Sequence, residues 1–75
     1  MTYSTHLLRH TRLTIGQNIH GLRAQRKLPL EKLARLTGIS EDLIDRYELG
    51  KNEIRLDELL KIACALKADL KTFLP

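Results

Sequence analysis

Apolar residues recur every three or four positions along most of this chain, the spacing of amphipathic helices, and no segment alternates as a strand would. Helices are predicted over residues 15–27, 30–37, 40–49 and 56–66, with a short fifth helix or final turn over 70–74. The inner face of the helix at 56–66 is predicted to comprise Leu56, Leu59, Leu60, Ala63 and Leu66. The pattern therefore predicts an all-α fold, a compact bundle of five short helices.

Residues with turn and cap preferences mark the ends of these helices. Thr14 followed by Gln17 is typical of a capping box, which places the start of the first helix immediately after Thr14. Pro29 ends that helix and leads into the next. Gly38 is expected to adopt a positive φ at a tight turn. Ser40 is expected to cap the helix that follows, because its hydroxyl can accept a bond from a free backbone N–H.

The first thirteen residues contain few apolar side chains, too few for a stable helix of their own. Residues 1–13 are therefore predicted to form an N-terminal arm, which is free to be flexible, and residues 14–75 a single domain. The arm carries His6 and His10 at four-residue spacing. Two histidines without a third ligand are weak evidence for a metal site, and none is predicted.

Ala34, Gly38 and Ile44 follow one another at offsets of four and six. This spacing suits two short helices that cross at a tight turn. In such a unit the second helix is presented outward, as a recognition helix is in DNA-binding proteins.

The composition limits the functional classes. A chain of 75 residues forms one small domain with a thin core, whose net stability is roughly 3–5 kcal/mol. The net charge of +4 favours nucleic acid or an acidic surface as partner. The one cysteine, Cys64, is expected to be buried, and a lone cysteine indicates a reducing, cytoplasmic location. No membrane span, nucleophile–base pair or phosphate-binding glycine loop is apparent, so neither catalysis nor a cofactor is predicted.

Four segments in sequence order carry a family signature: IGQNIHGLRAQR, EKLARLTGIS, DLIDRYELGK and LDELLKIACAL. With them, the stretch from Ile15 to Leu74 resembles the phage-repressor/Cro-type (XRE-like) helix-turn-helix family. The resemblance implies sequence-specific binding of double-stranded DNA, usually as a homodimer, with the helix from Ser40 in the major groove. It also implies a partly buried ion pair between Arg23 and Glu48, although Glu48 could instead be an ordinary exposed acid.

The resemblance also implies which side chains meet DNA. Carried over position by position, those facing the bases are Glu41, Asp42, Asp45 and Arg46. Ser40 would cap the helix and donate to a DNA phosphate. The loop residues Lys51, Asn52 and Arg55 would also contact phosphates of the DNA backbone. Each has a plainer alternative. The first-turn acids suit the helix dipole, Arg46 could pair with Asp42 four residues earlier, and the loop could simply be solvated.

The predicted recognition helix is acidic, which departs from the family pattern. Between residues 40 and 49 the net charge is −3, so the rest of the chain carries +7. Carboxylates can accept a bond from cytosine but repel phosphates. Two alternatives therefore remain open. The chain could be a protein-interaction module, antitoxin-like or adaptor-like, or it could bind DNA without sequence preference.

The sequence leaves the dimer contact undecided. Leu70, Phe73 and Leu74 form an apolar cluster at the end of the chain, which could either join two copies or close the core. The N-terminal arm is an equal candidate for the contact.

Overall fold

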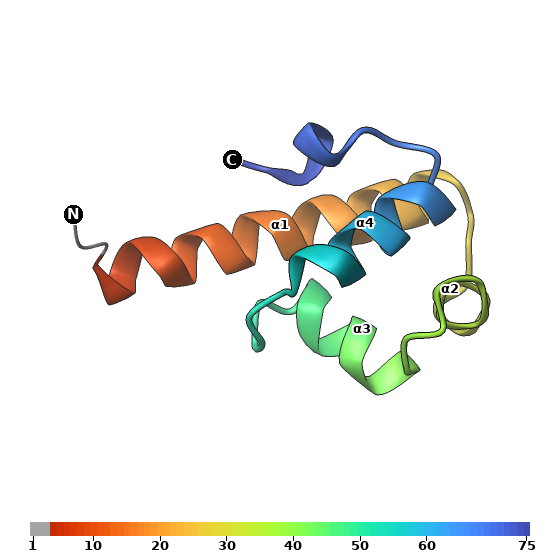
Figure 1. Ribbon diagram of the computed structural model, residues 1–75, viewed down its shortest axis with the longest axis horizontal. Helices are drawn as coiled ribbons and strands as arrows, with labels where there is room; N and C mark the ends of the chain where they lie inside the picture. Colours follow the sequence, from red (N-terminus) through yellow and green to blue (C-terminus); the bar gives the residue numbers. More distant parts are fainter. Residues whose placement is uncertain (1–3) are drawn as a thin grey trace.

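The computed structural model describes residues 4–75, which contain four α-helices and one 3₁₀ turn (Figure 1). These elements are α1 (Thr5–Gln25), α2 (Leu30–Thr37), α3 (Glu41–Glu48), α4 (Leu56–Ala65) and η1 (Leu70–Phe73). No strand occurs within residues 4–75, and the predicted all-α fold is confirmed. The fifth element is a single 3₁₀ turn, so the bundle has four α-helices where five short helices were predicted.

The first helix begins ten residues earlier than predicted. Its N-cap is Ser4, whose side chain accepts a hydrogen bond of 3.1 Å from the backbone N–H of Leu7. The predicted start after Thr14 is wrong, and the proposed boundary between arm and domain lies inside α1. Lengthening an existing helix avoids the cost of nucleation, because the packed part of α1 already supplies the first turns. Residues 1–3 of the predicted arm lie outside the described residues.

The core lies between the helices, with Ile19, Leu33, Ile44, Ile62, Leu66 and Phe73 fully buried. The predicted inner face of α4 is partly wrong. Leu56 and Leu60 are 64% and 47% exposed, whereas Ile62, which was not assigned to that face, is completely covered. Cys64 is exposed, contrary to the prediction that it is buried. Phe73 closes the core, and its carbonyl accepts a bond of 2.9 Å from the amide of Asn18.

The turn between α2 and α3 forms as the sequence predicts. Gly38 has a φ of 74°, and its N–H donates to the carbonyl of Ala34 at 2.8 Å. The buried hydroxyl of Thr37 donates to the carbonyl of Leu33 at 2.8 Å and accepts from the N–H of Ile39 at 3.2 Å. These bonds satisfy the backbone groups released where α2 ends, and so hold the two helices at a defined angle.

Each end of α3 makes a distinctive contact. Its N-cap Ser40 accepts a bond of 3.2 Å from the N–H of Leu43. Its C-terminal end lies directly on α1 at Gly16, where a Cβ atom would come within 2.2 Å of the carbonyl oxygen of Tyr47. Only a glycine permits this approach of one backbone to the other.

Within residues 4–75, no helix combines the length and the apolar character that crossing a bilayer requires.

Candidate nucleic-acid interface

One face of α3 is anchored in the core, and the opposite face is open to solvent. Ile44 and Tyr47 are buried, and the hydroxyl of Tyr47 donates to the carboxylate of Glu58 on α4. Burial and this bond raise the pKa of Tyr47 to about 12, so the side chain stays neutral and keeps its proton for Glu58. The four side chains predicted to face the bases are all exposed: Glu41, Asp42, Asp45 and Arg46.

Arg46 forms the intrahelical pair with Asp42 that is the alternative to a contact with DNA. Its Nε lies 3.3 Å from Oδ2 of Asp42, and the two side chains are 53% and 80% exposed. Exposed pairs of this kind contribute little to stability, so the guanidinium is free to exchange Asp42 for a phosphate or a base. Among residues 4–75, the ion pairs do not include Glu41 or Asp45.

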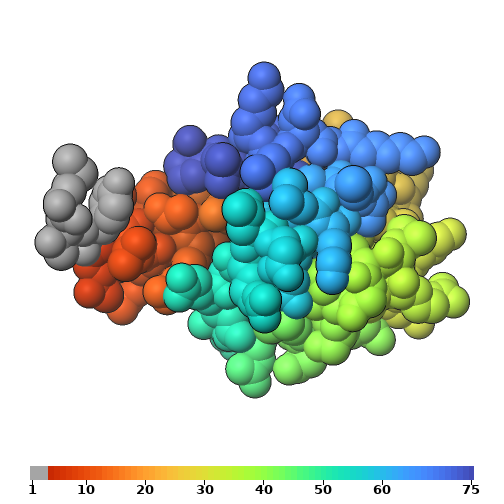
Figure 2. All heavy atoms as spheres, viewed as in Figure 1, coloured from red at the N-terminus to blue at the C-terminus, as the bar shows by residue number. Residues whose placement is uncertain are grey.

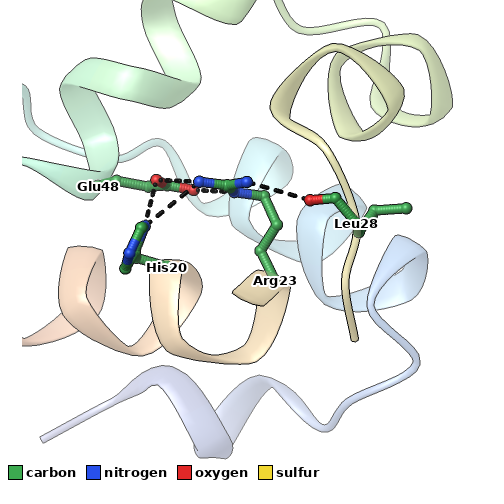
Figure 3. Close-up of polar contacts among 4 residues, drawn as sticks. All are labelled: His20, Arg23, Leu28 and Glu48. Atoms are coloured by element: carbon green, nitrogen blue, oxygen red, sulfur yellow. Dashed lines mark hydrogen bonds and ion pairs between the residues drawn. The ribbon is translucent and has the colours of Figure 1, made fainter. Parts of the chain in front are cut away.

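Glu48 points inward, away from the exposed face of α3 (Figure 3). Arg23 holds it with two bonds, from Nε to Oε2 at 2.7 Å and from Nη2 to Oε1 at 3.0 Å. A third bond runs from Nη1 of Arg23 to the carbonyl of Leu28 at 3.0 Å. The Glu48 side chain is only 6% exposed. The implied ion pair is therefore present in the structure, as a bidentate contact that ties α1 to the end of α3.

The charges of this pair are stabilised in the folded state. The hydrogen bonds that Arg23 donates to Glu48 are the main reason that the pKa of Arg23 is raised. Burial by itself raises the pKa of Glu48, but the bonds from Arg23 and His20 outweigh it and leave that pKa below its ordinary value. Glu48 is therefore a charged carboxylate whose charge is compensated by Arg23 inside the protein. The outer face of α3 is left with three acids and one arginine.

His20 is the member of this cluster that sequence reasoning missed. Its Nδ1 lies 3.0 Å from Oε1 of Glu48. The signal that could have found it is its position three residues before Arg23, which puts both side chains on one face of α1. The other two histidines, His6 and His10, are exposed. Within residues 4–75, no cluster of three or more His, Cys, Asp and Glu side chains is arranged to hold a metal ion.

Cations flank both ends of α3. Lys51 and Arg55 are exposed in the loop that follows the helix, with Asn52 half-buried between them. Arg55 lies 3.3 Å from Asp57 in an exposed pair. At the other end, Arg35 of α2 lines the groove of the α2–α3 turn together with Glu31 and Glu41, a position that the sequence pattern did not indicate. The acidic surface of α3 is thus bounded by positive side chains before and after it.

The comparisons with known proteins agree with this arrangement. The helix-turn-helix family profile matches residues 19–73, so the chain belongs to that family, as the resemblance indicated. A curated relative from Rhodospirillum rubrum, described as an uncharacterized transcriptional regulator in the ATPase CF(0) region, is 35% identical over 69 residues. That alignment covers 92% of this chain, which spans only 64% of the length of that relative.

Two solved structures share the fold at similar levels of identity. The restriction-modification controller protein C.AhdI from Aeromonas hydrophila superposes with a TM-score of 0.80 at 29% identity, covering 83% of this chain and 94% of its own. An HTH_3 family transcriptional regulator from Vibrio cholerae gives a TM-score of 0.83 at 30% identity, covering 88% of this chain and 37% of its own.

Proposed function

We propose that this protein is a transcriptional regulator that binds specific sequences of double-stranded DNA as a homodimer, with α3 in the major groove. The observation that carries the proposal is the free outer face of α3, held on a rigid scaffold and bounded by cations at both ends. Phosphate contacts at both ends of a recognition helix position it, and its outward side chains then read base edges. A cytoplasmic location goes with this role.

The family and its relatives support the same function. Two of the proteins to which this chain is similar are described as transcriptional regulators, and a third as a controller protein. The internal pairing of Glu48 also weakens the main objection to DNA binding, because it removes one carboxylate from the face of α3. Of the three remaining acids, Glu41 and Asp42 lie in the first turn, where the helix dipole stabilises them, and Asp45 lies in the second turn.

The first test separates base contacts from phosphate contacts. Arg46→Ala is expected to weaken binding to DNA from upstream of the protein's own gene by about 1–3 kcal/mol and to blur its sequence preference. Lys51→Ala is expected to weaken binding to all sequences alike and to lower the slope of log affinity against log salt by about 1. Gel-shift titrations at several salt concentrations measure both effects.

Lys71→Ala is the matched control for the loss of one positive charge. Lys71 lies in η1, on the opposite side of the molecule from α3 (Figure 1), and its removal should leave the binding nearly unchanged. The absence of any shifted band at low salt would contradict DNA binding. Affinity that ignores sequence, equally in the wild type and the Arg46 variant, would instead identify a non-specific binder.

A second candidate function rests on Glu41 and Asp45, the exposed acids outside every ion pair of residues 4–75. In that case the acidic face docks on a basic protein, as an antitoxin or adaptor would. The double variant Glu41→Lys, Asp45→Lys distinguishes the two functions. If α3 faces DNA, its non-specific DNA affinity should rise and its salt dependence steepen, because two repulsions become attractions.

If α3 instead binds a basic protein, the same double variant should lose a partner that co-purifies stoichiometrically with the wild type, and its DNA affinity should not change. An unchanged DNA affinity would therefore argue against placing α3 in the major groove. Quantitative gel shifts on random-sequence DNA and co-purification with the tagged chain supply the two measurements.

A further inference from the structure

The apolar stripe of α1 continues beyond the core. Leu8, Ile15 and Ile19 lie on one face of this helix, since they are seven and four residues apart. Their exposure rises along the stripe, from 0% at Ile19 to 9% at Ile15 and 44% at Leu8. The reason is visible in Figure 1, where the N-terminal turns of α1 extend past the other helices. The face that packs against the molecule's own core is therefore left partly uncovered at its N-terminal end.

A hollow of about 200 Å³ lies where the stripe leaves the core. It is lined by Leu8, Thr11, Arg12 and Ile15 of α1 and by Glu53 and Ile54 of the α3–α4 loop. Figure 2 shows these first turns of α1 (red to orange) beside that loop (teal). Among residues 4–75, neither Arg12 nor Glu53 takes part in an ion pair. The hollow thus has an apolar lining and one side chain of each charge.

We propose that this surface is the contact of the homodimer, in which the α1 helices of two copies lie antiparallel and Leu8 of each enters the hollow of the other. The inference rests on the proposed function only for its dimeric state. A two-fold contact needs a surface that complements itself. Here Arg12 of one copy meets Glu53 of the other, and the symmetry operation repeats the pair. The charges of the hollow therefore favour a second copy of this chain over a partner of one sign.

The sequence of the projecting turns gives the same indication. Between Thr5 and Thr14 it contains three threonines and two histidines, which are weak helix formers, so these turns gain from being covered. A stable interface buries about 800 Å² on each partner, more than the hollow alone can supply. Leu7, which is 45% exposed in the first turns of α1, offers further apolar surface at this end of the molecule.

The geometry also suits two recognition helices on one duplex. Gly16, which touches the C-terminal end of α3, follows Leu8 by eight residues, roughly 12 Å along α1. A two-fold axis at Leu8 would therefore separate the C-terminal ends of the two α3 helices by roughly 24 Å along this direction. Because the N-terminal end of α3 lies on the side of α2 (Figure 1), the centres of the two α3 helices would lie farther apart than their C-terminal ends. Successive half-sites on DNA lie about 34–36 Å apart.

The test is sedimentation of the full chain without DNA. The wild type should form a dimer, and Leu8→Glu should weaken its association at least tenfold. Leu60→Glu is the matched control, because Leu60 is 47% exposed and lies in a different apolar groove, beside Leu36 on α2. Circular dichroism shows whether each variant remains folded. A wild type that stays monomeric, or dissociation by Leu60→Glu but not by Leu8→Glu, would overturn the proposal.

A mixing experiment tests the cross-pairs directly. Arg12→Glu alone and Glu53→Arg alone should each self-associate more weakly, because each homodimer opposes like charges twice. Mixed in equal amounts, the two variants should recover dimers, since every cross-pair is then of opposite sign. A rearrangement within one chain cannot produce that recovery, so a mixture no more dimeric than its parts would refute the contact. The sedimentation and mixing experiments are both done without DNA, so they test the dimer contact alone. Gel shifts of the same variants test the proposed function separately.

Discussion

Gly16→Ala is expected to abolish the folded state. A Cβ atom at this position would lie 2.2 Å from the carbonyl oxygen of Tyr47 and 2.7 Å from that of Glu48. Both are backbone atoms, so no side-chain rotation can relieve the clash, and α1 and α3 must separate. Overpacking typically costs about 1–3 kcal/mol, and a rigid backbone clash more. A domain of this size has only about 3–5 kcal/mol to lose.

Gly21→Ala in the same helix is the matched control. A Cβ atom there meets nothing within 4 Å. The substitution should therefore stabilise the protein by about 0.5–1 kcal/mol, the ordinary advantage of alanine over glycine inside a helix. Urea unfolding followed by circular dichroism measures both variants. Equal stability of the Gly16 and Gly21 variants would mean that the two helix backbones do not approach as the structure shows.

Features decided by neighbouring residues could be predicted from the sequence. Gly38 and Ser40 are examples, because a left-handed turn residue and an N-cap are fixed by hydrogen bonds that reach only three or four positions along the chain. The same holds for the bounds of α2, which match the prediction. The order of the amphipathic segments then limited the fold to a small helical bundle.

Features that depend on residues far apart in the chain could not be predicted from the sequence. Thr14 and Gln17 have the preferences of a capping box, but Ser4 caps the helix, because packing of α1 against the core lets it continue through Thr14. The importance of Gly16 is equally invisible locally, since the atoms that it must admit belong to Tyr47 and Glu48. In both cases tertiary packing overrides a local preference.

The buried face of α4 also could not be predicted from the sequence alone. Apolar residues occupy most of this helix, so periodicity alone does not say which column of side chains turns inward. The positions of α2 and η1 decide it, which buries Ile62 and leaves Leu56 and Leu60 exposed. For the site, the family resemblance supplied the pair of Arg23 and Glu48. The contribution of Arg35 became apparent only from the three-dimensional arrangement, whereas that of His20 is suggested in the sequence by its position three residues before Arg23. The roles of the predicted DNA-contacting residues stay predictions.

Arg23→Met is expected to cost about 3–5 kcal/mol at pH 7, because it leaves the carboxylate of Glu48 buried without its main partner. The double variant Arg23→Met, Glu48→Met should recover most of the loss, since an apolar pair of similar volume often replaces a buried ion pair without penalty. The carbonyl of Leu28 also loses a donor in both variants, which sets a residual cost of about 1 kcal/mol. Urea unfolding of the wild type and both variants tests the comparison.

The pH dependence of these variants separates the ion pair from mere packing. In the wild type the pKa of Glu48 is lowered by folding. Its contribution is therefore complete above the unfolded-state pKa of about 4.3 and is lost as the pH falls through the lower folded-state pKa. In the Arg23→Met variant, burial dominates and raises that pKa, so protonation relieves the unpaired charge. The difference in stability between wild type and variant should therefore shrink from pH 7 to pH 4. A difference that stays constant over this range would show that Arg23 stabilises the fold through packing and not through its charge.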